Sequence, residues 1–382
     1  MIYLDHAATS FPKPRTVTEE QARCMRQYCG NPGRGSHVLS MAAAEKIYRC
    51  RCEASALFGS TSPETVIFTM NATMAINTVI KGILRTGDHV IFSDLEHNAV
   101  YRPIYRMARQ GLISYDIFKT DATDGTCTAE RICKGIEKLI KPRTRLVITA
   151  HASNICSAVL PIEEIGALCR RRGIFFAVDA AQSAGHIPID VQRMQIDALC
   201  LPGHKGLLGP QGSGLLLLGE NVTLDTLMEG GSGVNSLEGS MPEESPERYE
   251  AGTLPTPAIA GLCEGISFLR QLGVERVGQH TEILSKRLLQ GLGELPRVKV
   301  YTPHHVGAIT LFNIDGLSPE RVGEELNRRG ICVRAGYHCS GLGHATLQTG
   351  AGGAVRISTG LFNTPSQIDV TLEAIREICE KC

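Results

Sequence analysis

Short, wholly apolar runs alternate with helix-like segments through the first half of the chain, and this alternation limits the possible folds. The sequence predicts strands at Thr65–Thr69, His89–Ser93, Ile113–Phe118, Arg145–Ala150 and Ile174–Asp179. It predicts helices at Ser40–Leu57, Ala72–Leu84, Val100–Arg109, Ala129–Ile140 and Ile162–Arg172. Strands that are apolar on both faces and are joined by helices pair in parallel and are covered on both sides. We therefore expect an α/β fold with a mostly parallel sheet.

The pattern changes after Asp179 and restarts near Thr256. Two strands, Ala198–Leu201 and Gly214–Leu218, precede a loop at Gly230–Ser245 that is rich in Gly, Ser, Glu and Pro. The later segments are predicted as helices at Pro257–Leu272, Val274–Gly291, Pro319–Arg329 and from Pro365 to the C-terminus, with strands at Ala308–Ile314 and Ile331–Arg334. We expect a large domain over residues 15–255 and a small domain formed by residues 1–14 and 256–382.

The balance of charge excludes some classes of partner. Lys and Arg total 39, as do Asp and Glu, and no long basic run occurs. Binding to nucleic acid or to an anionic membrane through bulk charge is therefore not expected. Apolar runs such as Leu215–Leu218 are too short to span a bilayer. The N-terminus carries no secretory signal, so we expect a cytoplasmic protein whose 14 cysteines are mostly reduced.

Polar residues follow several predicted strands, where α/β sheets bind their ligands. Ala72 and Thr73 begin a helix, where backbone N–H groups can hold a phosphate or Thr73 can simply cap the helix. Asp179 ends an apolar strand and is either a helix cap or the counter-ion of a buried cation. Lys205 lies between glycines and is either an exposed turn residue or a nucleophilic amine. Together these features fit pyridoxal 5′-phosphate, which needs a lysine, an anion at its ring nitrogen and a phosphate site.

Longer motifs carry a family resemblance across nearly the whole chain. Residues 178–186 (VDAAQSAGH), 203–205 (GHK) and 209–212 (GPQG) resemble the class V aminotransferases. Within that group the chain is similar to the cysteine desulfurases and selenocysteine lyases, through residues 3–9 (YLDHAAT), 96–97 (EH), 248–253 (RYEAGT) and 334–339 (RAGYHC). The resemblance implies fold type I of the pyridoxal-phosphate enzymes: a large domain with a mostly parallel sheet of the seven-stranded type and a smaller α+β C-terminal domain.

The resemblance also assigns roles around the cofactor. Lys205 would bind pyridoxal 5′-phosphate covalently and move the substrate's α-proton, Asp179 would pair with the ring nitrogen, and His97 would stack on the ring. Further cofactor contacts are implied for Ala72, Thr73, Asn154, Gln182, His204 and, from a second subunit, Thr253. The active site would then be shared across a homodimer. Pro202 departs from the family pattern, which has Ser or Thr there, so one phosphate ligand is missing.

Substrate binding and sulfur chemistry are assigned in the same way. Arg356 would clamp the substrate carboxylate, unless it is a surface strand arginine, with Arg334, Asn154 and His37 as helpers. Cys339 matches the desulfurase nucleophile, and we expect the positive charges of Arg334 and His338 to favour its thiolate. The other thirteen cysteines are expected to be inert. A Cys379–Cys382 pair at the chain end is a weaker candidate for redox or sulfur-relay chemistry.

The resemblance implies conversion of L-cysteine to L-alanine, with a persulfide left on Cys339 for a separate acceptor protein. A selenocysteine lyase would use the same groups on selenocysteine. An aminotransferase or a C–S lyase would not require Cys339, and a non-catalytic protein could retain only the fold. No metal site is expected.

Overall fold

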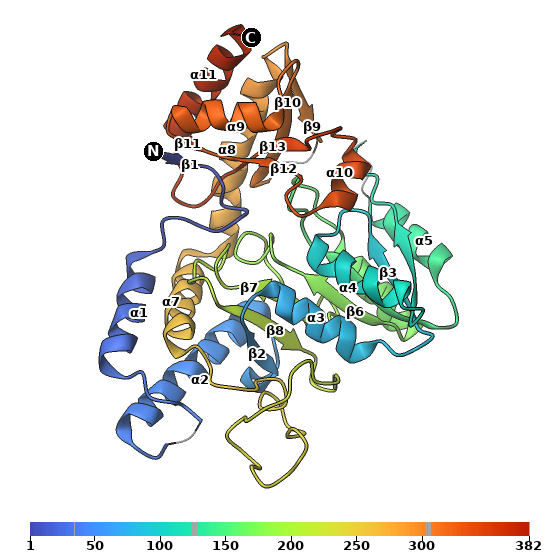
Figure 1. The fold of residues 1–382 in the computed structure, drawn as a ribbon, viewed down its shortest axis with the longest axis vertical. Helices are drawn as coiled ribbons and strands as arrows, with labels where there is room; N and C mark the ends of the chain where they lie inside the picture. Colours follow the sequence, from blue (N-terminus) through green and yellow to red (C-terminus); the bar gives the residue numbers. More distant parts are fainter. Residues whose placement is uncertain (34, 124–127, 303, 305–306, 382) are drawn as a thin grey trace.

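A computed structural model describes residues 1–33, 35–123, 128–302, 304 and 307–381 (Figure 1). Its larger part is built on a seven-stranded sheet with the order β2-β8-β7-β6-β5-β3-β4. The strands are β2 (Val66–Thr69), β3 (His89–Ser93), β4 (Ser114–Phe118), β5 (Thr144–Ala150), β6 (Phe175–Asp179), β7 (Ala198–Pro202) and β8 (Gly214–Leu218). Strands β3 to β7 pair in parallel, and β8 pairs antiparallel with β7 and β2. The mostly parallel sheet is confirmed.

Helices cover both faces of this sheet. The helices of the larger part are α1 (Arg15–Gln27), α2 (Val38–Phe58), α3 (Ala72–Ile83), α4 (Asn98–Arg109), α5 (Ala129–Leu139), α6 (Ile162–Arg172), α7 (Thr256–Leu272) and the 3₁₀ turn η1 (Pro63–Thr65). Val178 and Leu199 point into a core shared with α2, α5, α6 and α7. Their neighbours Ala177 and Ala198 point into the opposite core, with α3 and α4. Alternate strand residues are therefore buried on both faces, which is why the strands are apolar throughout.

A smaller α+β part lies above the large sheet in Figure 1. It has an antiparallel sheet of order β12-β13-β10-β9 and a two-stranded parallel pair of β1 with β11. The strands are β1 (Ile2–Tyr3), β9 (Val298–Tyr301), β10 (Ile309–Ile314), β11 (Ile331–Cys332), β12 (Arg334–Gly336) and β13 (Ala354–Ser358). The helices are α8 (Val274–Gly293), α9 (Pro319–Arg328), α10 (Gly341–Leu347) and α11 (Pro365–Lys381). The N-terminal residues thus join the C-terminal part of the fold.

The structure differs from the sequence prediction in its short elements. The single strand expected at Ile331–Arg334 is two strands, because β11 pairs with the N-terminal β1 whereas β12 pairs with β13. Helix α1 was not predicted, since among its apolar residues only Val17 and Cys24 are buried and the apolar stripe is weak. Residues 230–245 contain no helix or strand, as expected.

The domain boundary stays a prediction. Ile259, Leu262 and Ile266 of α7 pack in the core of the large sheet, whereas Leu284 and Leu288 of α8 pack in the core of the smaller part. This packing favours a division between α7 and the second half of α8 over one at residue 255. Across the described ranges, no helix combines the length and the apolar character needed to cross a membrane.

Candidate active site

A pocket lies at the carboxyl ends of β5, β6 and β7, beside the start of α3. Because these strands are parallel, the residues that follow them meet at one edge of the sheet. The pocket brings together all but one of the predicted cofactor residues, namely Ala72, Thr73, His97, Asn154, Asp179, Gln182, His204 and Lys205. The missing one is Thr253. Pro202 also lines the pocket.

Lys205 lies half-buried in this pocket. Loss of water around its amine lowers its pKa to about 8, and the charges of Arg356 and Arg334 act in the same direction. The carboxylate of Asp179 acts in the opposite direction. A lysine whose pKa is lowered in this way loses its proton more readily, which suits it to nucleophilic and proton-transfer chemistry. The exposed-turn alternative does not describe this residue.

Two carboxyl groups lie at or just after the ends of β6 and β3, the strands on either side of β5. Asp179 is 4% exposed, and its Oδ1 accepts a hydrogen bond from the Ala181 N–H at 2.9 Å. Glu96 is fully buried; its Oε1 accepts from the Ser93 hydroxyl and from the Ala150 N–H, and its Oε2 has no partner among the described residues. Burial, helped by the charge of Asp179, raises the pKa of Glu96 to about 8. A pKa of about 8 leaves Glu96 mostly protonated at pH 7. Burial also raises the pKa of Asp179, while the Ala181 N–H and the charge of Lys205 act in the opposite direction, so the cation beside Asp179 favours its carboxylate form.

The start of α3 has the features of an anion site. Asn71 caps the helix, its Oδ1 accepting from the Met74 N–H at 2.9 Å. The N–H groups of Ala72 and Thr73 come first in the helix and have no acceptor within it. They are aligned with the positive end of the helix dipole. This arrangement fits a phosphate group.

His97 also lines the pocket, and it is a neutral imidazole. Its Nδ1 accepts from the Ala99 N–H at 3.0 Å and so caps α4. Burial, and then the charge of Lys205, lowers its pKa to about 4. A neutral ring held by a helix cap can lie against a flat ligand without a charge to be desolvated.

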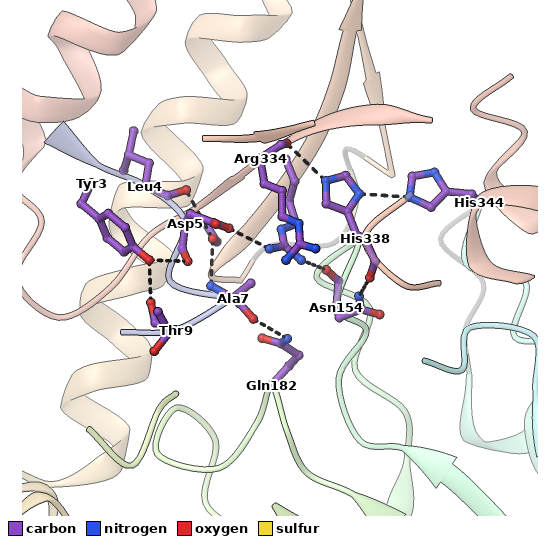
Figure 2. Close-up of polar contacts among 12 residues, drawn as sticks. Tyr3, Leu4, Asp5, Ala7, Thr9, Asn154, Gln182, Arg334, His338 and His344 are labelled. Atoms are coloured by element: carbon purple, nitrogen blue, oxygen red, sulfur yellow. Dashed lines mark hydrogen bonds and ion pairs between the residues drawn. The ribbon is translucent and has the colours of Figure 1, made fainter. Parts of the chain in front are cut away.

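The N-terminal segment is hydrogen-bonded to two residues that line the pocket, and Figure 2 shows the contact to Gln182. Gln182 Nε2 donates to the Ala7 carbonyl at 3.1 Å, and His204 Nδ1 lies 3.1 Å from Thr9 Oγ1. The Tyr3 hydroxyl donates to the Thr9 carbonyl at 2.9 Å and fixes this turn. The sequence motif at residues 3–9 indicated the family but not this contact, since the segment is about 200 residues from its partners along the chain.

Arg356 is buried beside the pocket, and it is not a surface strand residue. It is 2% exposed and donates to the Asn154 carbonyl at 2.9 Å and to Asp5 Oδ1 at 2.8 Å. Its Nε has no hydrogen-bond partner among the described residues. Arg334 lies opposite it in the β12–β13 register. Two arginines on paired strands, with one carboxylate bound to Arg356, leave positive charge available for an anionic ligand.

Cys339 is exposed and lines a groove that shares Thr73, His97 and Ala99 with the pocket. It and His338 have φ angles of 56° and 49°, in the left-handed region. The backbone is held on both sides: the Asn98 N–H donates to the Cys339 carbonyl at 2.8 Å, and Asn154 Nδ2 donates to the His338 carbonyl at 2.8 Å. These bonds fix a strained turn that presents the thiol outward.

The expected role of His338 as a positive neighbour of Cys339 is wrong. Its Nε2 donates to the Arg334 carbonyl at 3.2 Å, and in the neutral ring its Nδ1 accepts from His344 Nε2 at 3.1 Å (Figure 2). His344 Nδ1 then accepts from the Thr349 hydroxyl at 2.8 Å. Burial, followed by the charge of Arg356, lowers the pKa of His338 to about 3. The ring is neutral and supports the turn; the sequence alone gave no sign of His344 as its partner.

Comparison with known proteins places the chain in a family. The family model for class-V aminotransferases matches residues 2–371. The chain belongs to the class V aminotransferase family.

Similar proteins span almost the whole chain. A probable cysteine desulfurase of Methanothermobacter thermautotrophicus is 34% identical over 99% of this chain and 94% of that protein. A cysteine desulfurase of Salmonella agona is 30% identical over 99% of this chain and 93% of that protein. The apo structure of the cysteine desulfurase from Thermococcus onnurineus NA1 has a TM-score of 0.89 and 30% identity, covering 100% of this chain and 95% of that one. The fold of this class V aminotransferase is fold type I.

Five predicted site residues of this class V aminotransferase do not line the pocket. Arg334, Arg356 and Cys339 lie beside it, whereas His37 and Thr253 lie elsewhere. His37 is exposed and caps α2, its Nδ1 accepting from the Ser40 N–H at 3.3 Å. Thr253 lines a different cavity, beside Asn31 and Glu250. One chain alone therefore does not bring either residue to Lys205. Cys382 of the Cys379–Cys382 pair lies outside the described residues, and Cys29 and Cys339 are the exposed cysteines among those described.

Proposed function

We propose that this class V aminotransferase is a pyridoxal-phosphate-dependent cysteine desulfurase. It would convert L-cysteine to L-alanine and retain the sulfur as a persulfide on Cys339. The observation that carries the proposal is the position of Cys339, an exposed thiol on a hydrogen-bonded turn in a groove that adjoins the Lys205–Asp179 pocket. The names of the similar proteins support it.

The residues of the pocket fit pyridoxal 5′-phosphate. Lys205 offers an amine with a lowered pKa, Asp179 offers a buried carboxylate, and the first turn of α3 offers free N–H donors. His97 and Gln182 lie around the same space. Pro202 supplies neither a hydroxyl nor an N–H, so phosphate contacts depend on the remaining donors. When bound, the cofactor supplies an electron sink for negative charge at the substrate α-carbon.

Arg356 would bind the substrate and Lys205 would move its proton. A planar guanidinium binds a carboxylate through two parallel hydrogen bonds. The substrate carboxylate would take over one of the N–H groups that now reach Asp5, and it would also reach the unpartnered Nε. This fixes the α-carbon near Lys205, whose amine accepts the α-proton and returns it later.

Cys339 would take the sulfur. Its thiolate attacks the substrate sulfur, and a sulfur–sulfur bond forms as the bond between the β-carbon and sulfur breaks. The electron pair of the broken bond stays with the carbon skeleton, which is protonated to alanine. The persulfide left on Cys339 then passes to an acceptor protein.

A homodimer with shared sites would complete the pocket. Thr253 lies in a separate cavity of its own chain, so it would serve the phosphate of a second subunit. Eleven of the described cysteines, Cys379 aside, are free thiols, and unpaired thiols are typical of a reducing compartment. We therefore place the reaction in the cytoplasm.

A single-turnover assay tests this function. The holoenzyme is mixed with L-cysteine, and alanine is measured for the wild type, Cys339→Ala and the matched control Cys29→Ala. We expect alanine from the wild type and the control but almost none from Cys339→Ala. Keto-acid production, or alanine that is unaffected by Cys339→Ala, would instead indicate an aminotransferase or a C–S lyase. Alanine formed from selenocysteine alone would indicate a selenocysteine lyase.

A further inference from the structure

A groove beside Cys339 contains basic side chains and no acidic one among its described lining. It has a volume of about 340 Å³ and runs between α3 and α4. Lys81 comes from α3, and Arg102 and Arg106 come from α4. All three side chains are exposed. We refer to this groove, which is lined by Lys81, Arg102, Arg106 and Asn77, as the basic groove.

The three charges of the basic groove are not compensated by the fold. Within the described ranges, none of the three forms an ion pair or a side-chain hydrogen bond. Arg102 and Arg106 are four residues apart on one helix, where like charges repel and weaken the helix slightly. The chain as a whole has a net charge of zero, so the cluster does not reflect a generally basic surface.

The basic groove is continuous with the active site. Thr73, His97 and Ala99 line both the groove and the Lys205 pocket. Cys339 lines the groove. A molecule that collects sulfur from Cys339 must therefore approach along a surface with three unpaired positive charges.

We propose that the basic groove is the docking surface for the sulfur acceptor, and that the acceptor presents its thiol within an acidic surface. This inference rests on the proposed function. The acceptor thiolate attacks the outer sulfur of the Cys339 persulfide; a new sulfur–sulfur bond forms, the old one breaks, and its electron pair returns to Cys339 as thiolate. No oxidant or reductant is consumed. Unpaired charges in a groove raise the local concentration of an oppositely charged partner.

Two alkylating reagents of similar size test the charge of the groove without any turnover. Iodoacetate is anionic and iodoacetamide is neutral. The rate of alkylation by iodoacetate divided by the rate of alkylation by iodoacetamide at one thiol therefore reports the local electrostatic potential. Cys29, the other exposed cysteine described, is the internal reference, and peptide mass spectrometry separates the two sites. In the variant Lys81→Gln/Arg102→Gln/Arg106→Gln we expect this ratio to fall about threefold to tenfold at Cys339. It should stay unchanged at Cys29.

Persulfide transfer to short peptides tests the docking itself. Three acetylated and amidated pentapeptides carry a central cysteine flanked by four glutamates, four serines or four lysines. Each rate is compared between the wild type and the variant, so that the intrinsic reactivity of the peptide thiol cancels. We expect the variant to slow transfer to the acidic peptide about tenfold, to leave the serine peptide unchanged and to speed the lysine peptide. High salt should reduce these differences.

The outcomes separate this proposal from the proposed function. A ratio of wild-type to variant transfer rates that is the same for all three peptides, or an unchanged alkylation ratio, would overturn the docking surface. A variant that changes its oligomeric state in sedimentation would show that the groove is an interface between copies of this chain, which also overturns it. The first turnover forms alanine without any acceptor. If the wild type forms no alanine, the desulfurase proposal is refuted. The alkylation ratio does not depend on turnover, so it still tests the charge of the groove in that case.

Discussion

Replacement of Glu96 by glutamine tests whether this buried carboxyl is protonated in the folded protein. Burial is the main cause that raises its pKa from 4.5 to about 8. Above pH 4.5 the unfolded chain loses this proton, whereas the folded protein keeps it until about pH 8. The folded state then binds more protons than the unfolded state, so the free energy of unfolding falls as the pH rises through this window.

The size of this change in stability follows from the interval between the two pKa values of Glu96, which are 4.5 in the unfolded chain and about 8 in the folded protein. Each pH unit lowers the free energy of unfolding by about 1.4 kcal/mol, which gives a loss of about 3 kcal/mol at pH 7. Glutamine has nearly the same shape and has no such proton to lose. Its amide nitrogen would take the place of Oε2, which has no partner to be disrupted among the described residues. We expect Glu96→Gln to be more stable than the wild type at pH 7, by up to about 3 kcal/mol.

Urea unfolding between pH 5 and pH 8, at one protein concentration, measures this difference. The gain in free energy of unfolding should be small at pH 5 and should grow steadily up to pH 8. Glu238→Gln, on an exposed loop, is the matched control and should change stability by less than about 0.5 kcal/mol throughout. A gain that does not depend on pH, or a variant less stable than the wild type at every pH, would refute the protonated state of Glu96.

Three further predictions concern the substrate, the Cys339 turn and the subunit arrangement. Arg356→Lys should raise the KM for cysteine about tenfold to a hundredfold by removing the planar two-bond contact, with cofactor absorbance unchanged; an unchanged KM would exclude the clamp. His344→Leu should lower the free energy of unfolding by about 1 to 3 kcal/mol, because His338 Nδ1 loses its donor. The pH profile of Cys339 alkylation should not change, and a changed profile would indicate that His338 carries a charge. Neither the Lys205→Ala homodimer nor the Thr253→Ala homodimer should bind cofactor or form alanine when the cofactor is limiting. Dimers that contain one subunit of each variant should regain both properties. A mixture that is as inactive as the two homodimers would contradict shared sites.

The strand ends of the site could be predicted because the strands themselves carry a strong local signal. Asp179 and Lys205 each follow an apolar run, and parallel pairing brings such ends to one edge of a sheet. Family motifs then located His97, Asn154, Arg356 and Cys339. These predictions depend on short segments and on the general geometry of α/β sheets.

Contacts between distant segments could not be predicted. Arg356 meets Asp5 across 351 residues, and the pairing of β1 with β11 has no local pattern. Protonation states were equally hidden, since the neutral forms of Glu96 and His338 depend on tertiary burial. The motif around Cys339 suggested a positive neighbour, but the fold turns His338 inward toward His344.

The most direct test of the central claim is to locate the sulfur after one turnover. The holoenzyme is mixed with one equivalent of L-cysteine that carries radiolabelled sulfur, and the protein is alkylated, digested and separated into peptides. The account predicts label on the peptide that contains Cys339, in an amount that matches the alanine formed. Label released as free sulfide, or found on another cysteine while Cys339 stays unmodified, would contradict it.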